Sequence, residues 1–186
     1  MKVAVFCGSS SGNSPEYVKA AQSLGRYLAE QDIDLVYGGG KVGLMGAIAD
    51  SVLAHGGKVF GVIPQHLKNK EIAHKGLTEL RVVTDMHERK AMMASMADAF
   101  VALPGGAGTL EEIFEAWTWA QLGHHQKPCA FFNVNGFYDL LKEMLVSMSQ
   151  KGFMKSDYVD MLIYTNNAEE LVSSIKGYRA PEQKWS

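Results

Sequence analysis

The residue types best suited to chemistry lie together where an apolar, strand-like run passes into P-G-G-A-G-T-L-E-E at 104–112. This pattern indicates a strand, a glycine turn and the start of a helix. Glycines without Cβ atoms let successive backbone N–H groups point at a ligand, and a helix N-terminus favours phosphate. We expect Glu111 and Glu112 in the first helical turn, where a pure anion site gains nothing from carboxylates. The glycines of the turn are Gly105, Gly106 and Gly108.

The same stretch allows a purely structural interpretation. Thr109 to Glu112 fits a capping box, in which the Thr109 hydroxyl and the Glu112 carboxylate bind otherwise unpaired backbone N–H groups. The two interpretations are compatible. The carboxylate could cap the helix in the empty state and face a sugar when a ligand is bound.

A second candidate group lies in the helical segment M-H-E-R-K-A-M-M-A-S-M-A. Met92, Met93 and Met96 follow Arg89 by three, four and seven residues, which predicts Arg89 on the buried face near the helix N-terminus. A buried guanidinium needs a carboxylate or an anionic ligand. Lys90, a quarter-turn away, has the same two options.

Two earlier strand-like runs also end in glycine turns. The second turn matches G-x-G-x-x-G through Gly38, Gly40 and Gly43, between a strand and a helix as a dinucleotide site requires. The full pattern needs an acid about twenty residues later to hold a ribose, and the apolar run at 58–64 supplies none. We therefore expect nucleotide-binding geometry without NAD. The candidates for phosphate or nucleotide contact in the two turns are Gly8, Ser9, Gly39 and Gly40.

The polar segment 65–77 is long for a connection in a compact α/β protein. Segments of this kind serve as binding loops or lids, and the segment is equally compatible with an ordinary surface loop.

Seven strand-like runs alternate with helical patterns across the chain, without repeats or a linker. They predict an α/β fold: a doubly wound, mostly parallel seven-stranded Rossmann-like sheet with helices on both faces. We expect a single nucleotide-binding domain over 1–186, with a polar tail at about 177–186. In such sheets ligands bind at the carboxyl ends of the strands, and the glycine turns all fall on that edge.

Composition excludes several classes of protein. The formal net charge of -2 argues against a nucleic-acid partner, because binding to a phosphate backbone needs a clustered positive surplus. The apolar start of the chain is too short for a signal peptide or a membrane span, so we expect a cytoplasmic protein with no membrane partner. Cys7 and Cys129 are expected to be free thiols, and His124 and His125 lack the helical spacing of metal ligands. We therefore predict no metal and no cofactor.

Two motifs together resemble those of the Lonely Guy (LOG) family of cytokinin riboside 5'-monophosphate phosphoribohydrolases. They are P-G-G-A-G-T-L-E-E at 104–112 and M-H-E-R-K-A-M-M at 86–93, without departure from the family pattern. The likeness extends through V-F-C-G-S-S-S-G, Y-G-G-G-K-V-G-L-M-G, G-V-I-P and T-W-A-Q-L-G. It covers most of the chain up to about residue 150.

The resemblance implies hydrolysis of the N-glycosidic bond of an N6-substituted adenosine 5'-monophosphate, releasing free base and ribose 5-phosphate. It implies Arg89 and Glu112 as the catalytic pair, and a homodimer with its sites close to the subunit contact. The implied substrate-binding residues are Glu71, Lys90, Gly105, Gly106, Gly108, Thr109, Glu111 and Thr118.

The chemistry suits these residue types. Departure of a purine gives the ribosyl group oxocarbenium character, which a carboxylate beside C1' can stabilise, as in glycoside cleavage. Two rivals remain: a non-catalytic nucleotide or cofactor carrier, which gains little from Glu112, and a pyridoxal-dependent lysine decarboxylase. The second needs a Schiff-base lysine and an acidic partner for the pyridine nitrogen. Lys41 and Lys90 lie near the expected site, but no ring partner can be assigned, which disfavours the decarboxylase.

Overall fold

All seven strand-like runs of the sequence become strands, and the strands join one sheet in the computed structural model, which describes residues 1–68 and 73–181. Each pairing is parallel, and the order across the sheet is β4-β3-β2-β1-β5-β6-β7. The predicted doubly wound parallel sheet is confirmed. The strands are β1 (Lys2–Phe6), β2 (Asp34–Tyr37), β3 (Val59–Pro64), β4 (Glu79–Val83), β5 (Ala99–Ala102), β6 (Cys129–Phe132) and β7 (Ile163–Thr165).

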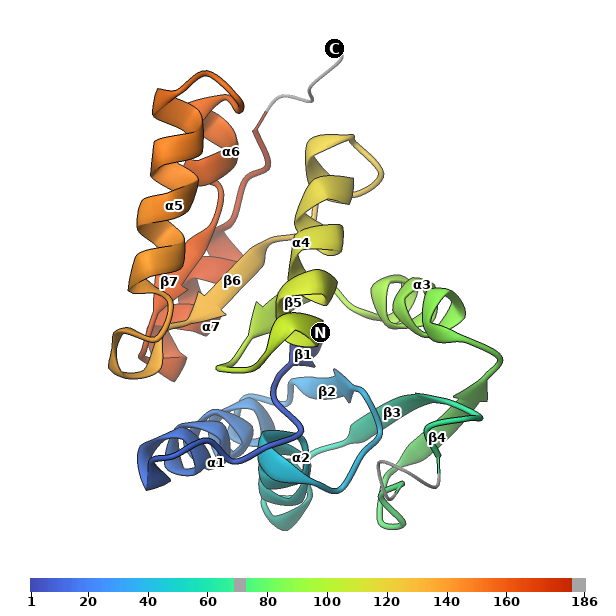
Figure 1. Cartoon of the computed structure of the whole chain (residues 1–186). Coiled ribbons are helices and arrows are strands. Elements are labelled where there is room, and N and C mark those ends of the chain that lie inside the picture. The colour runs from blue at the N-terminus through green and yellow to red at the C-terminus, as the bar shows by residue number, and fades with distance from the viewer. Residues whose placement is uncertain (69–72, 182–186) are drawn as a thin grey trace.

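Helices cover both faces of the sheet (Figure 1). One apolar cluster packs α1, α2 and α7 against the sheet through Leu24, Ile48 and Leu171. A second cluster packs α3 and α4 against the opposite face through Met93 and Ile113. The helices are α1 (Pro15–Glu30), α2 (Gly43–Ala54), α3 (Met86–Met96), α4 (Ala107–Gln121), α5 (Asp139–Gln150), α6 (Ser156–Asp160) and α7 (Ala168–Gly177), with a 3-10 turn η1 (Val134–Gly136).

The order of strands reverses at β1, which has β2 on one side and β5 on the other. The loops that follow β1 and β5 meet above this point. The Gly8 N–H donates a hydrogen bond to the Pro104 carbonyl oxygen at 3.1 Å. In open α/β sheets, ligands bind at the carboxyl edge where the strand order reverses. A ligand is therefore expected at these two loops.

The helix starts follow the sequence in two cases and depart from it in one. Ser14 caps α1 and Asp85 caps α3, each accepting a hydrogen bond from a backbone N–H. Helix α4 instead begins at Ala107 with Gly106 as its N-cap, so the capping box at Thr109 is wrong. The extended conformation of the glycine turn supplies the N-cap earlier than the side-chain pattern suggests. Glu111 and Glu112 consequently lie in the second turn of the helix, not in the first as expected.

Two further expectations, on membrane-spanning helices and on the C-terminal tail, can be compared with the structure. Within the described residues, no helix combines the length and the apolar character needed to cross a membrane. The tail predicted from 177 onward includes the last residue of α7, and residues 182–186 lie outside the part that the structure describes.

Candidate active site

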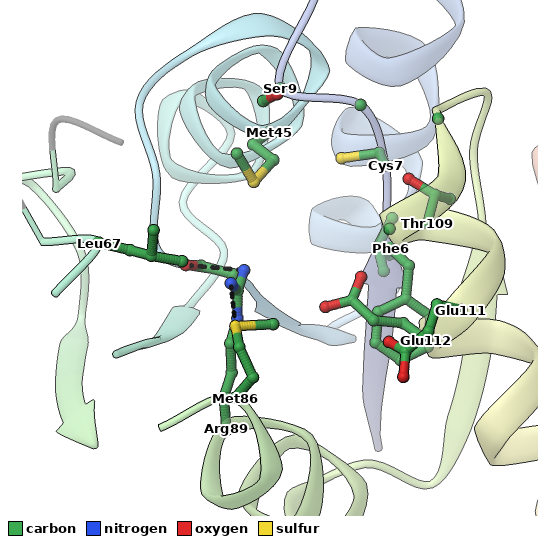
Figure 2. Close-up of a pocket in the computed structure, with 15 residues that line it drawn as sticks. Phe6, Cys7, Ser9, Met45, Leu67, Met86, Arg89, Thr109, Glu111 and Glu112 are labelled. Carbon is green, nitrogen blue, oxygen red and sulfur yellow. Dashed lines mark hydrogen bonds between the residues drawn. The ribbon is translucent and has the colours of Figure 1, made fainter. Parts of the chain in front are cut away.

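A pocket of about 250 Å³ opens at the carboxyl edge of the sheet, between the N-terminal ends of α3 and α4 (Figure 2). Its lining comes from several elements. Cys7 follows β1, Gly38 follows β2, Met45 belongs to α2, and Leu67 follows β3. The pocket thus draws on segments from both sides of the point where the strand order reverses.

The glycine turn before α4 forms one wall of this pocket. A Cβ atom on Gly105 would lie 2.1 Å from the Thr109 Oγ1 and 2.9 Å from the Gly8 backbone nitrogen, so only glycine fits there. Gly106 and Gly108 line the pocket and have open space on the side where a Cβ would project. A ligand can therefore approach the backbone at the N-terminus of α4, which is the arrangement that binds phosphate.

Arg89 forms the opposite wall, and its burial agrees with the methionine spacing. The residue is only 5% exposed. Its Nη2 donates a hydrogen bond to the Gly38 carbonyl oxygen at 3.3 Å, and its Nη1 contacts the Met86 Sδ at 3.7 Å. A Cβ on Gly38 would lie 1.9 Å from Nη2, so the glycine at the end of β2 makes room for the guanidinium.

Glu112 faces the same pocket from α4 (Figure 2). The charges of Glu112 and Arg89 both affect the pKa of the Cys7 thiol. Burial raises the pKa of Cys7, the negative charge of Glu112 raises this pKa further, and the positive charge of Arg89 lowers it. Both charged groups therefore act on one point at the end of β1, and Cys7 remains a neutral thiol.

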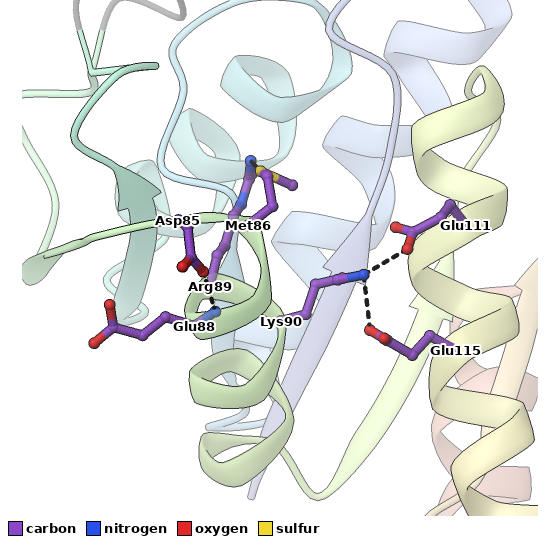
Figure 3. A network of polar contacts seen from close by, with 7 residues as sticks. All are labelled: Asp85, Met86, Glu88, Arg89, Lys90, Glu111 and Glu115. Carbon is purple, nitrogen blue, oxygen red and sulfur yellow. Dashed lines mark hydrogen bonds and ion pairs between the residues drawn. The ribbon is translucent and has the colours of Figure 1, made fainter.

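Lys90 points away from the pocket and towards α4 (Figure 3). Its Nζ contacts the Glu111 Oε1 at 2.5 Å and the Glu115 Oε2 at 3.1 Å. Glu111 still contributes to the pocket lining, whereas Lys90 is absent from it. The contact between Lys90 and a nucleotide stays a prediction, and Lys90 contacts two carboxylates in this structure.

The remaining candidates divide into two groups. Gly8 and Ser9 line the pocket beside the glycine turn. Gly39 and Gly40 do not line it: the Gly39 carbonyl accepts a hydrogen bond from the His74 N–H at 3.0 Å, and the Gly40 carbonyl accepts one from the Tyr37 hydroxyl at 3.0 Å. Thr118 is exposed on α4 and also lies outside the lining. Glu71 falls outside the described residues.

Several lining residues were missed by the sequence analysis. Cys7 had a detectable signal, because it directly precedes a glycine turn at the carboxyl end of a strand. Met45, Leu67 and Met86 had none, since methionine and leucine at helical or loop positions look like ordinary core residues. These three side chains give the pocket an apolar wall beside its charged groups.

The combined arrangement is a glycine turn at a helix N-terminus, a carboxylate and a buried guanidinium around one cavity. Such a set can hold a phosphorylated sugar and stabilise positive charge on it. Among residues 1–68 and 73–181, no three His, Cys, Asp or Glu side chains gather as a group that could hold a metal ion.

Comparison with known proteins places this chain in a family. A family model described as "Possible lysine decarboxylase" matches residues 45–175. The cytokinin riboside 5'-monophosphate phosphoribohydrolase LOG7 of Arabidopsis thaliana is 49% identical over 178 residues, which cover 95% of this chain and 82% of the relative. The chain belongs to the Lonely Guy family. The cytokinin riboside 5'-monophosphate phosphoribohydrolase LOG of Oryza sativa subsp. japonica is 47% identical over 177 residues, covering 95% of this chain and 73% of the relative.

Solved structures support the fold of this Lonely Guy protein. A molybdenum cofactor binding protein from Rippkaea orientalis has a TM-score of 0.72 at 21% identity and covers 95% of each chain. A Moco carrier protein from Chlamydomonas reinhardtii has a TM-score of 0.71 at 18% identity, again with 95% coverage of each chain. At these identities the likeness concerns the fold alone.

Proposed function

We propose that this Lonely Guy protein hydrolyses the N-glycosidic bond of N6-substituted adenosine 5'-monophosphates, with AMP as a further candidate substrate, and releases free base and D-ribose 5-phosphate. The observation that carries the proposal is the convergence of Glu112, Arg89 and the glycine turn on one pocket. Two similar proteins bear the name of this activity. A carboxylate, a guanidinium and a phosphate seat are the groups that the reaction needs.

The phosphate would bind to the backbone at Gly106 and Gly108, where its binding energy positions the ribose. Glu112 would lie beside C1', stabilise the positive charge that develops as the base departs, and orient the attacking water. The water oxygen bonds to C1' as the C1'–N9 bond breaks. The electron pair of that bond leaves with the base, which takes up a proton while the water loses one. Arg89 would orient Glu112 and contact the nucleotide.

The carrier function is less well supported. The proteins named as molybdenum cofactor carriers share the fold with this chain at 18–21% identity. A carrier of an anionic ligand gains nothing from a carboxylate at Glu112, because the negative charge repels the ligand.

The decarboxylase function conflicts with the state of Lys90. A Schiff base forms from a neutral amine. Burial alone would lower the pKa of Lys90, but the hydrogen bonds and charges of Glu111 and Glu115 outweigh burial, and the pKa is raised. A raised pKa disfavours the neutral amine that a Schiff base needs.

We also propose a homodimer in the cytoplasm, as the family resemblance implies. Large apolar side chains are exposed on and after α5, among them Leu140, Met144 and Phe153, and contact with a second copy would cover surface of this kind. Light scattering of the purified protein would report a mass of twice the 20.4 kDa of one chain. A monomer at all concentrations would contradict the proposal.

The decisive experiment incubates the protein with AMP and with N6-isopentenyl-AMP and separates the products by chromatography. Free base and ribose 5-phosphate should appear in equal amounts. Glu112→Gln removes the negative charge at nearly constant size and should lower kcat at least about 100-fold, the loss typical of one electrostatic group in the transition state. Release of base from neither nucleotide would favour the carrier function.

A further inference from the structure

We propose that His74, held by Asp50, is a positioning residue that fixes the turn at residues 38–40, and with it one wall of the pocket. These residues, called the β2 turn below, directly follow β2. The kinetic part of the proposal rests on the proposed hydrolase function, because it is read from the rate of base release. The structural part can be measured without any turnover.

The β2 turn needs a restraint from outside. Three consecutive glycines have little conformational restraint of their own, and Gly39 adopts a φ of 80°, in the left-handed region. Gly38 nevertheless lines the pocket, and its carbonyl oxygen accepts the hydrogen bond from Arg89 (Figure 2). A shift of the β2 turn would therefore move both a pocket wall and an acceptor of the guanidinium.

Residues 73 and 74, which are distant from the β2 turn in sequence, supply such a restraint. The His74 N–H donates a hydrogen bond to the Gly39 carbonyl oxygen at 3.0 Å. Ala73 forms an antiparallel bridge with Gly40. These backbone contacts can hold the β2 turn only if residues 73 and 74 are themselves held in place.

The side chain of His74 holds them through both ring nitrogens. Nδ1 accepts a hydrogen bond from the Gly76 N–H at 3.0 Å, so the proton of the ring lies on Nε2. Nε2 donates to the Asp50 Oδ1 on α2 at 2.8 Å. The His74 side chain is only 4% exposed, and a buried ring with both nitrogens bonded is fixed in one orientation. Asp50 thereby anchors residues 73 and 74 to α2.

The effect on the reaction would be indirect, because neither His74 nor Asp50 belongs to the pocket lining. Both act through the β2 turn. Misplacement of catalytic groups by about 1 Å can cost about 100-fold in rate. The phosphate site that we propose lies on a different element, at the N-terminus of α4. Loss of the anchor should therefore lower kcat and leave the affinity for a sugar phosphate nearly unchanged.

The test separates the two hydrogen bonds of the ring. His74→Gln places an amide N–H near Nε2 and can keep the bond to Asp50, whereas His74→Asn places an oxygen near Nδ1 and can keep only the bond to Gly76. Asp50→Ala removes the acceptor on α2, and Asp50→Asn retains an acceptor oxygen. Glu30→Ala is the matched control: its carboxylate, paired with Arg26 on α1, is 52% exposed, against 58% for Asp50.

Three quantities are measured for each protein. They are kcat and KM with N6-isopentenyl-AMP, the affinity for ribose 5-phosphate by calorimetry, and hydrogen exchange of the backbone amide of residue 74 at constant pH. Asp50→Ala should lower kcat about 10-fold and keep KM and the ribose 5-phosphate affinity within about threefold. Exchange of the amide should become at least about 10-fold faster, because its bond to Gly39 opens more often.

The other variants should follow the hydrogen bonds that they keep. Asp50→Asn and His74→Gln should retain more activity and slower amide exchange than Asp50→Ala and His74→Asn. The double variant Asp50→Ala/His74→Asn should be no worse than His74→Asn alone, because both changes break one bond. Glu30→Ala should match the unaltered protein in all three measurements.

Other results would overturn the proposal. An unchanged kcat in Asp50→Ala, or a raised KM with an unchanged kcat, would show that the anchor does not position the pocket wall for the reaction. Unchanged amide exchange would show that Asp50 does not hold His74 at all. Should His74→Asn fail to fold, Asp50→Ala decides alone, since it removes only a half-exposed carboxylate. If the unaltered protein releases no base, the hydrolase function has failed, and amide exchange still decides whether Asp50 holds His74 against the β2 turn.

Discussion

The guanidinium of Arg89 occupies the space that a side chain on Gly38 would take. A Cβ atom at this position would lie 1.9 Å from Nη2. We predict that Gly38→Ala displaces the guanidinium from the pocket and lowers base release at least about 10-fold, because a misplaced catalytic group loses its contact with the transition state.

The rate of base release is measured for the variant, and thermal unfolding checks that it is folded. Gly177→Ala serves as the control, since a Cβ there meets no atom within 4 Å. The control should keep full activity. A fully active Gly38→Ala protein would contradict the placement of Arg89.

Cys7 offers a second test at the scale of the residue, because its pKa depends on both catalytic candidates. Glu112→Gln removes a charge that raises the pKa of Cys7, so the thiolate fraction at mildly alkaline pH should increase. Each unit of pKa changes that fraction about tenfold. Alkylation by iodoacetamide, followed by mass spectrometry, should become several-fold faster in Glu112→Gln and slower in Arg89→Met.

Cys129 is the internal control, since it is fully buried and burial is the cause of its raised pKa. Its alkylation should stay slow in every variant. Equal rates at Cys7 in all three proteins would mean that Glu112 and Arg89 do not share one pocket.

Sequence periodicity predicted the burial of Arg89 correctly, and the reason is local. Met93 lies one turn later on the same face and is 1% exposed. The direction of Lys90 follows from the same periodicity, but its partners do not. They belong to α4, and only the packing of α3 beside α4 brings Glu111 and Glu115 within reach.

At the scale of the element, apolar runs predicted the inner strands, because buried parallel strands are continuously apolar. The edge strand β4 is mostly exposed and contains Glu79 and Arg81. The start of α4 was predicted too late. The pattern of side chains at Thr109 matched a capping box, but backbone contacts decided the boundary: Gly105 packs against Gly8, and Gly106 takes the N-cap position. Contacts between two loops distant in sequence leave no local signal.

Tyr138, just before α5, holds the chain that leads into the glycine turn through a hydrogen bond. Its buried hydroxyl donates a hydrogen bond to the Leu103 carbonyl oxygen at 2.6 Å, one residue before Pro104. Tyr138→Phe leaves that carbonyl without this donor. We predict a loss of about 1–3 kcal/mol in the free energy of unfolding, as for other buried groups left unsatisfied.

We also expect Tyr138→Phe to weaken binding of ribose 5-phosphate, because the turn that we propose to bind the phosphate loses a restraint. Urea unfolding and calorimetry measure the two effects. Tyr27→Phe, on α1, is the control and should change the unfolding free energy by less than about 0.5 kcal/mol. A Tyr138→Phe protein as stable as this control would show that the hydroxyl does not restrain the turn.

At the scale of the whole molecule, the pocket lies where two halves of the sheet meet. Strands β2 to β4 extend from one side of β1, and β5 to β7 extend from the other. Cys7 follows the shared strand, Gly38 and Leu67 come from the first half, and Gly106 and Glu112 follow β5. A ligand in this pocket therefore contacts both halves together, which no single element can provide.

This arrangement predicts which parts of the protein a bound ligand stabilises. Ribose 5-phosphate binds the folded chain, so at about 100 times its Kd it should raise the unfolding free energy by about 2.7 kcal/mol. Ribose without phosphate should have a much smaller effect, because it lacks the group that the N-terminus of α4 attracts. Amide hydrogen exchange should slow at the carboxyl ends of both β2 and β5, since opening either half exposes the ligand. Protection limited to the loop before α4 would mean that the phosphate binds there alone and that the ribose does not reach Arg89.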